Sequence, residues 1–230
     1  MDYEIIRIDE RSWRIEDGGV RFFLLEGAEK ALLIDTGMSG LDARGIARSL
    51  TDRPVALLNT HADRDHVGAN AQFDRCLMHP AEAEHYAKSG VDCTIVPVND
   101  GDVIDIGGRP LRIIHLPGHT PGSIAVLDEN ARVLISGDPI QTDGRIFMFG
   151  GHRNMGDYIA SLERLAGMEE LFDEIWPSHA TIPVPVDTID RLIAGARDIV
   201  AGRITGKETD FHGQTICVCD LGFTVMLCDA

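Results

Sequence analysis

Four side chains of the kind that bind metal ions lie within six residues of one another. His61, Asp63, Asp65 and His66 follow shortly after the apolar run 55–58. A capped turn can use one or two aspartates in this way, but it has no use for the two flanking imidazoles. Histidine nitrogens and carboxylate oxygens are common ligands of zinc, iron and manganese. The spacing therefore predicts a metal site at the end of a buried strand.

Three further side chains of this kind follow apolar runs later in the chain. His119 lies in the run Gly-His-Thr-Pro-Gly-Ser, where proline and glycine fix a turn that aims one imidazole. Asp138 and His179 each stand at the exit of a short apolar run, beside Gly, Pro or Ser. Together with the first four they make seven ligands. Seven ligands of these types suit two divalent cations that share a bridging carboxylate.

The spacing of apolar residues predicts which elements hold these side chains. Strands are expected over residues 3–8, 14–25 (with a turn at 17–19), 31–34, 55–58, 76–78, 103–106, 111–115, 123–127, 133–135, 174–176 and, as a pair, 215–228. Helices are expected over 41–50, 67–73, 81–88, 155–165 and 186–204. The polar segment 59–66 is expected to be neither strand nor core. Two rounds of strands and helices indicate two sheets packed face to face with helices outside. The polar side chains then gather on loops at one edge of the sheets.

Length, charge and cysteine content narrow the class of protein. The 230 residues fit one domain over 1–230 and can bury a core without disulfides or a structural metal, so a bound metal is expected to serve chemistry. A net charge of -16 without any Lys/Arg cluster argues against a nucleic-acid polymer as partner. The five cysteines form no CxxC pair, the first residues lack the features of a signal peptide, and no apolar run approaches the roughly 20 residues of a membrane span. We expect a cytoplasmic protein without membrane contact.

These motifs resemble the metallo-β-lactamase superfamily. The pattern of that family is an Asp-Thr-Gly strand end, then His-x-His-x-Asp-His, a later His, a later Asp and a final His. The matching positions stand in the same order here, as Asp35-Thr36-Gly37, the segment 61–66, His119, Asp138 and His179. The resemblance covers about residues 3 to 180 and implies an α+β fold, a four-layer αββα sandwich with the metals at one edge.

The resemblance also implies a role for each ligand. By this match the first metal is held by His61 and His119, the second by Asp65, His66 and His179, and Asp138 bridges the two. Asp35 steadies the 61–66 loop. Asp63 departs from the pattern, which has a second histidine there, and a carboxylate at this position is similar to flavodiiron proteins and to some phosphodiesterase-like and DNA-uptake-associated branches. Zinc is the expected ion, and a carboxylate shifts the preference somewhat toward iron or manganese.

The chemistry expected of this constellation is hydrolysis. Hydroxide bound by two metal ions would attack an ester, thioester, lactone or similar small-molecule bond, with Asp65 and Asp138 as catalytic residues. A small-molecule phosphodiesterase is one alternative. A diiron oxygen- or nitric-oxide-reducing centre is another, although no flavodoxin-like domain follows to deliver electrons. A metal-free binding protein with the same fold is the third alternative.

Two residues after the apolar stretch 146–151 are candidates for the substrate site. We predict that Arg153, together with His152, meets an anionic group of the substrate; a packed loop before a helix is the equally weighted structural alternative. The isolated histidines are expected to have structural or surface roles: His79, His85, His115 and His212. The expected partner is a small-molecule substrate, and a homo-oligomer is compatible with the sequence.

Overall fold

The first sheet is built by the amino-terminal half of the chain. The computed structural model describes residues 3–38 and 40–230; Met1, Asp2 and Ser39, among them the start of the predicted single domain, lie outside the described residues. Seven strands follow one another across this sheet: β1 (Tyr3–Asp9), β2 (Ser12–Asp17), β3 (Val20–Glu26), β4 (Ala31–Ile34), β5 (Val55–Leu58), β6 (Arg75–Met78) and β7 (Thr94–Pro97). Neighbours from β1 to β4 are antiparallel, and neighbours from β4 to β7 are parallel. The parallel crossovers carry the helices α1 (Ala43–Leu50), α2 (Arg64–Val67) and α3 (Ala83–Ala87).

The second sheet is formed by the middle of the chain. Its five strands lie in the order β13 (Glu174–Pro177), β11 (Val133–Gly137), β10 (Ile124–Asp128), β9 (Pro110–His115) and β8 (Val103–Asp105). All neighbours are antiparallel except β11 and β13, which run parallel. Helix α4 (Met155–Ala166) lies on the connection to β13, and α5 (Thr188–Val200) follows that strand.

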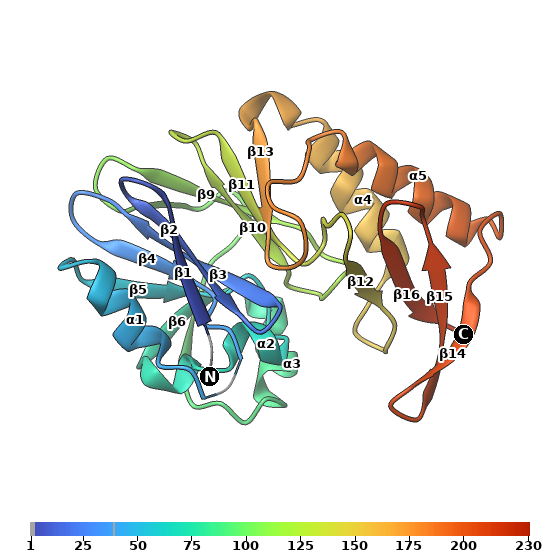
Figure 1. Cartoon of the computed structure of the whole chain (residues 1–230), viewed down its shortest axis with the longest axis horizontal. Coiled ribbons are helices and arrows are strands. Elements are labelled where there is room, and N and C mark those ends of the chain that lie inside the picture. The colour runs from blue at the N-terminus through green and yellow to red at the C-terminus, as the bar shows by residue number, and fades with distance from the viewer. Residues whose placement is uncertain (1–2, 39) are drawn as a thin grey trace.

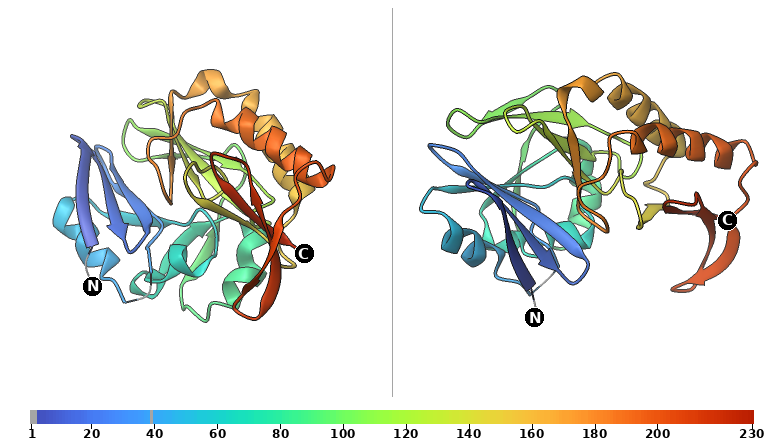
Figure 2. Two further views of the ribbon diagram at one scale, coloured as in Figure 1. Left: turned by 45° about the vertical axis from the view of Figure 1, so that its right-hand side comes forward. Right: turned by 45° about the horizontal axis from the view of Figure 1, so that its top comes forward.

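Three hydrophobic clusters hold these elements in four layers. One cluster lies between the two sheets and includes Ile34 from the first and Ile135 from the second. Another packs Ile46 of α1 against the outer face of the first sheet. The third packs Leu162 of α4 and Leu192 of α5 against the outer face of the second sheet. Helices therefore cover both outer faces (Figures 1 and 2), and the predicted α+β four-layer sandwich is confirmed.

The pair of strands expected over 215–228 is present, but it belongs to a third sheet that was not predicted. Its four strands lie in the order β12 (Arg145–Met148), β16 (Val225–Asp229), β15 (Gln214–Asp220) and β14 (Lys207–Phe211). β12 pairs in parallel with β16, far along the chain, and no strand was expected over 145–148. Ile146 and Met226 of this sheet share the cluster with α4 and α5. Figure 1 shows the sheet beside those helices.

Two expectations around the His61–His66 segment are wrong. Helix α2 begins inside this polar segment, and the helix expected over 67–73 is replaced by a single 3-10 turn, Asn70–Gln72. His61 and His66 are completely buried although the segment was expected to stay outside the core. Some of the buried polar groups beside the segment have protein partners: the amides of Asn59 and Asn70 bond each other, and the amide of Asn59 also bonds the carbonyl of His66. Polarity alone did not reveal this internal network.

Smaller differences concern element boundaries. The helix expected over 81–88 is a 3-10 turn at Pro80–Glu82 followed by α3, and α5 is shorter than the range 186–204. Strands β7 and β14 were not predicted. Within the described ranges, the structure contains no helix that is both long and apolar enough to cross a membrane.

Candidate metal centre

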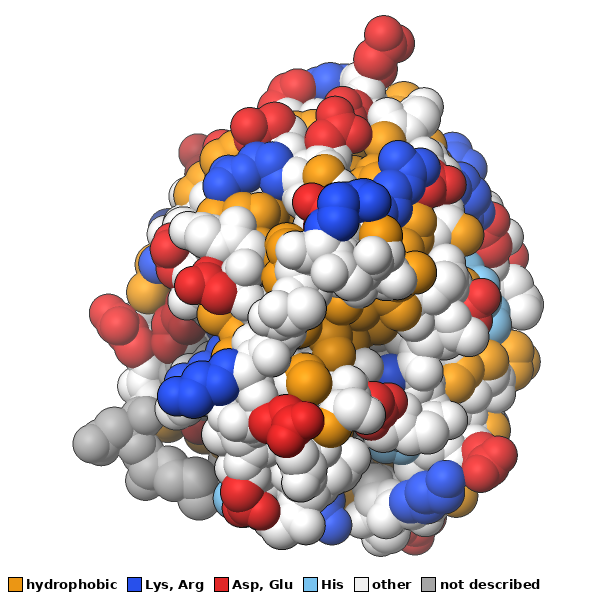
Figure 3. All heavy atoms as spheres, turned by 90° about the vertical axis from the view of Figure 1, so that its right-hand side faces the viewer, with side chains coloured by type: hydrophobic (Ala, Val, Ile, Leu, Met, Phe, Trp, Pro, Cys, Tyr) orange, Lys and Arg blue, Asp and Glu red, His pale blue; other side chains and the backbone are white. Residues whose placement is uncertain are grey.

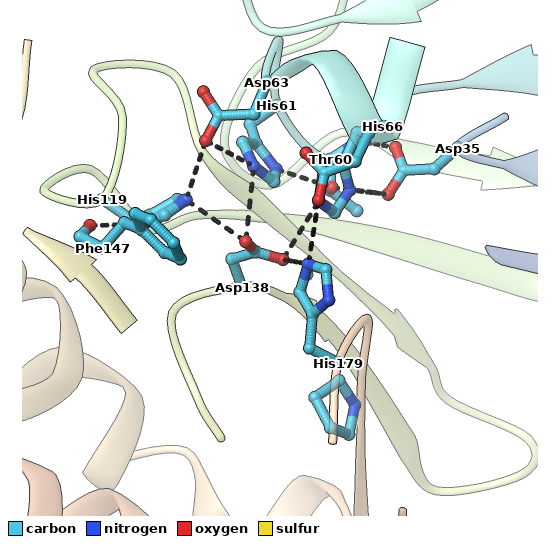
Figure 4. A network of polar contacts seen from close by, with 12 residues as sticks. Asp35, Thr60, His61, Asp63, His66, His119, Asp138, Phe147 and His179 are labelled. Atoms are coloured by element: carbon cyan, nitrogen blue, oxygen red, sulfur yellow. Dashed lines mark hydrogen bonds and ion pairs between the residues drawn. The ribbon is translucent and has the colours of Figure 1, made fainter. Parts of the chain in front are cut away.

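The predicted ligands come together at one edge of the two sheets. His61 follows β5, and Asp138 and His179 follow β11 and β13. Because β4 and β5 are parallel to each other, as are β11 and β13, each pair of strands ends at the same edge of its sheet. His119 lies on the loop between β9 and β10, and α2 carries Asp65 and His66. Figure 4 shows Asp138 at the centre of this group.

The second predicted site is the more compact of the two. Nε2 of His179 lies 3.2 Å from Oδ2 of Asp65 and 3.2 Å from Oδ1 of Asp138. Nε2 of His66 lies 3.1 Å from the same Asp138 oxygen and 3.8 Å from Oδ2 of Asp65. Ligands at about 2.0–2.1 Å from a tetrahedral ion are roughly 3.3 Å apart. These four side chains therefore have the spacing of a ligand set.

The first predicted site uses the other oxygen of Asp138. That Oδ2 lies 3.9 Å from Nε2 of His61 and 3.6 Å from Nε2 of His119. Oδ2 of Asp63 lies 3.5 Å and 3.4 Å from the same two nitrogens. Since Oδ1 of Asp138 faces the second site and Oδ2 the first, its carboxylate has the orientation of a bridge between two cations.

Each of the four imidazoles is held by its Nδ1. Nδ1 of His61 contacts Oγ1 of Thr60 at 3.0 Å, and Nδ1 of His66 contacts Oδ2 of Asp35 at 2.9 Å. Nδ1 of His119 contacts the backbone carbonyl of Phe147 at 2.9 Å, and Nδ1 of His179 contacts that of Gly19 at 2.8 Å. Carbonyl and carboxylate oxygens only accept hydrogen bonds, and the Thr60 hydroxyl already donates to Asp35. Nδ1 therefore carries a proton in each ring, and in the neutral ring the lone pair is on Nε2, which faces the centre.

Several atoms at the centre are buried without a hydrogen-bond partner. Among the described residues, the buried atoms without a hydrogen-bond partner include Nε2 of His61, Nε2 of His66 and Oδ1 of Asp138. Unpaired buried polar atoms are costly and rare in folded proteins. Here all three are ligand atoms of the predicted sites, and a cation beside them would satisfy each one. The residues present therefore fit a bound metal.

The pKa values reflect the concentration of negative charge. Burial would raise the pKa of Asp138, but His179 and His66 beside it hold that pKa well below its usual range. Burial would lower the pKa of His179, yet the neighbouring Asp138 and Asp65 raise it to about 10. Burial also opposes a charge on His66, but Asp138, Asp65 and Asp35 raise its pKa well above the ordinary value. The carboxylates thus draw positive charge into the second site.

Asp35 fixes the orientation of two elements of the centre. Its backbone is left-handed, with φ 67°, and Oδ1 accepts the N–H of Thr60 at 2.7 Å. Its Oδ2 accepts the hydroxyl of Thr60 and contacts Nδ1 of His66. We therefore propose that Asp35 steadies both the start of the 61–66 loop, through Thr60, and the imidazole of His66.

Replacing Asp35 by Asn tests this role. Asparagine tolerates left-handed backbone. Its amide N–H₂ would replace Oδ2, however, and cannot accept a proton from the Thr60 hydroxyl or from Nδ1 of His66. His66 then loses its fixed orientation. Partners of this kind alter metal affinity about 10–100-fold, and we expect a loss of that size at the second site in a zinc titration. Asp143→Asn, at another left-handed aspartate with φ 58°, is the matched control. Equal zinc affinity in the two variants would contradict the role.

The two predicted substrate-binding residues, Arg153 and His152, have different contacts: Arg153 bonds ligands of the first site, and His152 stacks on another histidine. Nη2 of Arg153 bonds Oδ2 of Asp63 at 2.8 Å, and Nη1 contacts Nε2 of His119 at 3.0 Å. The ring of His152 stacks on that of His85 with centroids 4.3 Å apart. Substrate binding by Arg153 and His152 stays a prediction, and both residues line the pocket described below.

Two residues near the centre were missed in the sequence. Nε2 of His85 contacts Oδ1 of Asp63 at 2.7 Å, although His85 was assigned a structural or surface role. Glu82 is completely buried and accepts the backbone N–H groups of Ala62 and Gly122 at 2.8 and 2.6 Å. Nothing in the spacing of the sequence indicated these contacts, because each joins segments about 20 to 40 residues apart.

A cavity of about 1060 Å³ opens over the centre. Its floor includes Asp63, Asp65, Asp138 and His179, and the turn 220–225 of the third sheet, with Asp220 and Phe223, forms part of its wall. The face on the side of this sheet carries hydrophobic side chains near its middle, with acidic and basic groups around them (Figure 3). A volume of this size accommodates a small-molecule ligand.

Curated relatives cover most of the chain. An acyl-coenzyme A thioesterase of Bos taurus, MBLAC2, is 31% identical over 220 residues, 76% of this chain and 77% of that protein. The human protein of the same name is 30% identical with the same coverage. A hydroxyacylglutathione hydrolase of Methylococcus capsulatus is 30% identical over 67% of this chain and 59% of its own length.

Solved structures and a family model agree on the fold. A metallo-beta-lactamase from Pontibacter korlensis superposes with a TM-score of 0.73 at 16% identity, over 86% of this chain and all of that one. A metallo-beta-lactamase from Erythrobacter litoralis gives 0.68 at 20% identity, over 85% and 96% of the two chains. The family model described as "Metallo-beta-lactamase superfamily" matches residues 15–172, which include six of the seven predicted ligands, all except His179. The chain belongs to the metallo-beta-lactamase superfamily.

Proposed function

We propose that this protein is a metal-dependent hydrolase of acyl thioesters. The observation that carries the proposal is the pair of ligand groups on either side of Asp138, at the floor of a cavity large enough for a small molecule. Family membership and relatives named as hydrolases support hydrolysis as the reaction class. The printed name of the two MBLAC2 relatives, acyl-coenzyme A thioesterase, favours a thioester among the candidate bonds.

The residues present would hold two divalent ions, with zinc expected first and iron or manganese next. His61, Asp63 and His119 would face one ion, Asp65, His66 and His179 the other, with Asp138 between them. When bound, such ions polarise a carbonyl oxygen and lower the pKa of a water molecule. Hydrolysis then breaks the C–S bond: the hydroxyl of water joins the acyl carbon, and a proton is transferred to the leaving sulfur.

Asp65 is the residue proposed to handle this proton. Its carboxylate lines the cavity and contacts Nε2 of His179. Burial would raise its pKa, but His66 and His179 lower it below the ordinary value, so the group is ionised at neutral pH. An ionised carboxylate at the floor of the cavity can orient the attacking water and accept its proton. Asp138 is proposed to hold the centre together.

A phosphodiester is the second candidate substrate, on one specific observation. Besides Arg153, three cationic side chains line the cavity: Arg64, Lys88 and Arg145. They suit phosphate groups, which a cyclic or diester nucleotide carries. Coenzyme A also carries phosphates, so the same residues are compatible with the thioester proposal, and only the bond that is cleaved separates the two.

A substrate panel with and without metal tests the proposal. We expect the chelated protein to lose thioesterase activity on acyl-coenzyme A substrates and to regain it with zinc, because the centre supplies both the polarised carbonyl and the activated water. Oxygen esters, lactones and bis-nitrophenyl phosphate serve as competing substrates. Thioesterase activity that survives complete metal removal, or a kcat/KM higher for the phosphodiester than for every thioester, would refute it.

A further inference from the structure

Arg153 contacts two ligands of the first site, Asp63 and His119. Its Nη2 lies 2.8 Å from Oδ2 of Asp63, and its Nη1 lies 3.0 Å from Nε2 of His119. These are the same atoms that lie 3.4 Å from each other and would bind an ion. The guanidinium therefore uses ligand atoms of the first site as its own hydrogen-bond acceptors.

The contact with His119 excludes simultaneous metal binding at the same atom. Nδ1 of this ring contacts the carbonyl of Phe147 and carries the proton, so Nε2 has one lone pair in the ring plane. That lone pair can accept an N–H of Arg153 or bind a cation, but not both.

Asp63 is committed to protein partners at both oxygens. Oδ1 contacts Nε2 of His85 at 2.7 Å, and Oδ2 accepts from Arg153. In the family pattern this position is a second histidine, which carries no charge to pair with a guanidinium. The aspartate at 63 and the arginine at 153 thus form a charge-matched pair inside the first site.

Arg153 is anchored rather than loosely placed. Its side chain is only 8% exposed. Its backbone N–H bonds the carbonyl of Gly150 at 3.0 Å, just before α4, and Nη1 also donates to the carbonyl of His119. By contrast, within the described part of the chain no Lys or Arg side chain is bonded to Asp65, His66, Asp138 or His179, the ligands of the second site.

We propose that Arg153 is an internal cation that competes with the metal for the first site. The second site then fills first, and the first site fills only when Arg153 leaves Asp63 and His119. The proposal rests on the proposed function only in requiring that the centre binds metal. By this proposal the two sites differ in metal affinity because of Arg153, which is not a ligand of either site.

Zinc and cobalt titrations of the metal-free protein test the proposal. We expect two binding steps with Kd values at least about tenfold apart, because a cation within a few ångströms strongly opposes a second one. Arg153→Met keeps a long apolar stem and removes the charge, and should tighten the weaker step at least about tenfold while the tighter step is unchanged. Arg153→Lys keeps the charge and should keep the steps apart. Calorimetry and the visible spectrum of bound cobalt report each step without any assay of activity.

Arg145→Met is the matched control, because Arg145 lines the same cavity but is exposed to solvent. Its weaker step should stay within about twofold of the parent, since water screens an exposed charge. The unchanged tighter step shows that Arg153→Met has folded. Equal Kd values for the two steps in the parent, or a weaker step that Arg153→Met leaves unmoved, would overturn the proposal. Metal binding as expected without thioesterase activity would instead refute the proposed function alone.

Discussion

Asp138→Asn is expected to remove nearly all hydrolytic activity and at least one bound metal. The substitution keeps the shape of the side chain but removes the charge that faces both ligand groups, at 3.1 and 3.2 Å from His66 and His179 and 3.6 Å from His119. Without a shared carboxylate two cations repel each other at close range. We expect kcat/KM to fall at least about a thousandfold, equivalent to about 4 kcal/mol of barrier. Elemental analysis beside thioesterase kinetics measures both effects.

Asp128→Asn is the matched control for this variant. Asp128 is also a buried aspartate, 1% exposed, but its carboxylate pairs with Arg109 away from the centre. Its replacement should lower stability and leave metal content and the activity of the folded protein unchanged. Full activity in Asp138→Asn, or the same loss of metal in both variants, would show that Asp138 does not bridge the two sites.

Sequence patterns predicted the parts of the centre that depend on strand ends. Each of Asp35, His61, Asp138 and His179 follows a short apolar run, and runs of this length that end at turn residues are typical of buried strands. Parallel pairing then brings these ends to one edge without further information. The predicted ligand set and the αββα layers follow from this local signal together with the family resemblance.

Contacts between distant segments could not be predicted in the same way. Arg153 reaches Asp63 across 90 residues, and His85 reaches it from a helix face that looks ordinary in sequence. The third sheet depends on the parallel pairing of β12 with β16, two short strands whose partners are not adjacent in the chain. Neither periodicity nor turn residues encode which side chains meet after folding, so these features appear only in three dimensions.

Glu82→Ala is expected to destabilise the fold and weaken the first site together. Each oxygen of this buried carboxylate accepts one backbone N–H, from Ala62 beside His61 and from Gly122 on the His119 loop. The alanine leaves two buried N–H groups without a partner, each costing about 1–3 kcal/mol. We expect a loss of about 4 kcal/mol in the free energy of unfolding, or roughly 10 °C in Tm for a chain of this size. Calorimetry of the metal-free protein measures it.

The expected effect on metal binding separates Glu82 from a purely structural residue. Both loops that Glu82 joins carry ligands of the first site, whereas the second site depends on α2 and on the ends of β11 and β13. The weaker metal-binding step should therefore be lost before the tighter one. Glu84→Ala is the control, since Glu84 lies two residues further along, on α3, and its solvent-exposed pair with Lys88 contributes less than about 1 kcal/mol. If Glu82→Ala melts within 2 °C of Glu84→Ala (a difference of roughly 1 kcal/mol or less), or if it weakens both metal-binding steps equally, Glu82 does not couple the two ligand loops.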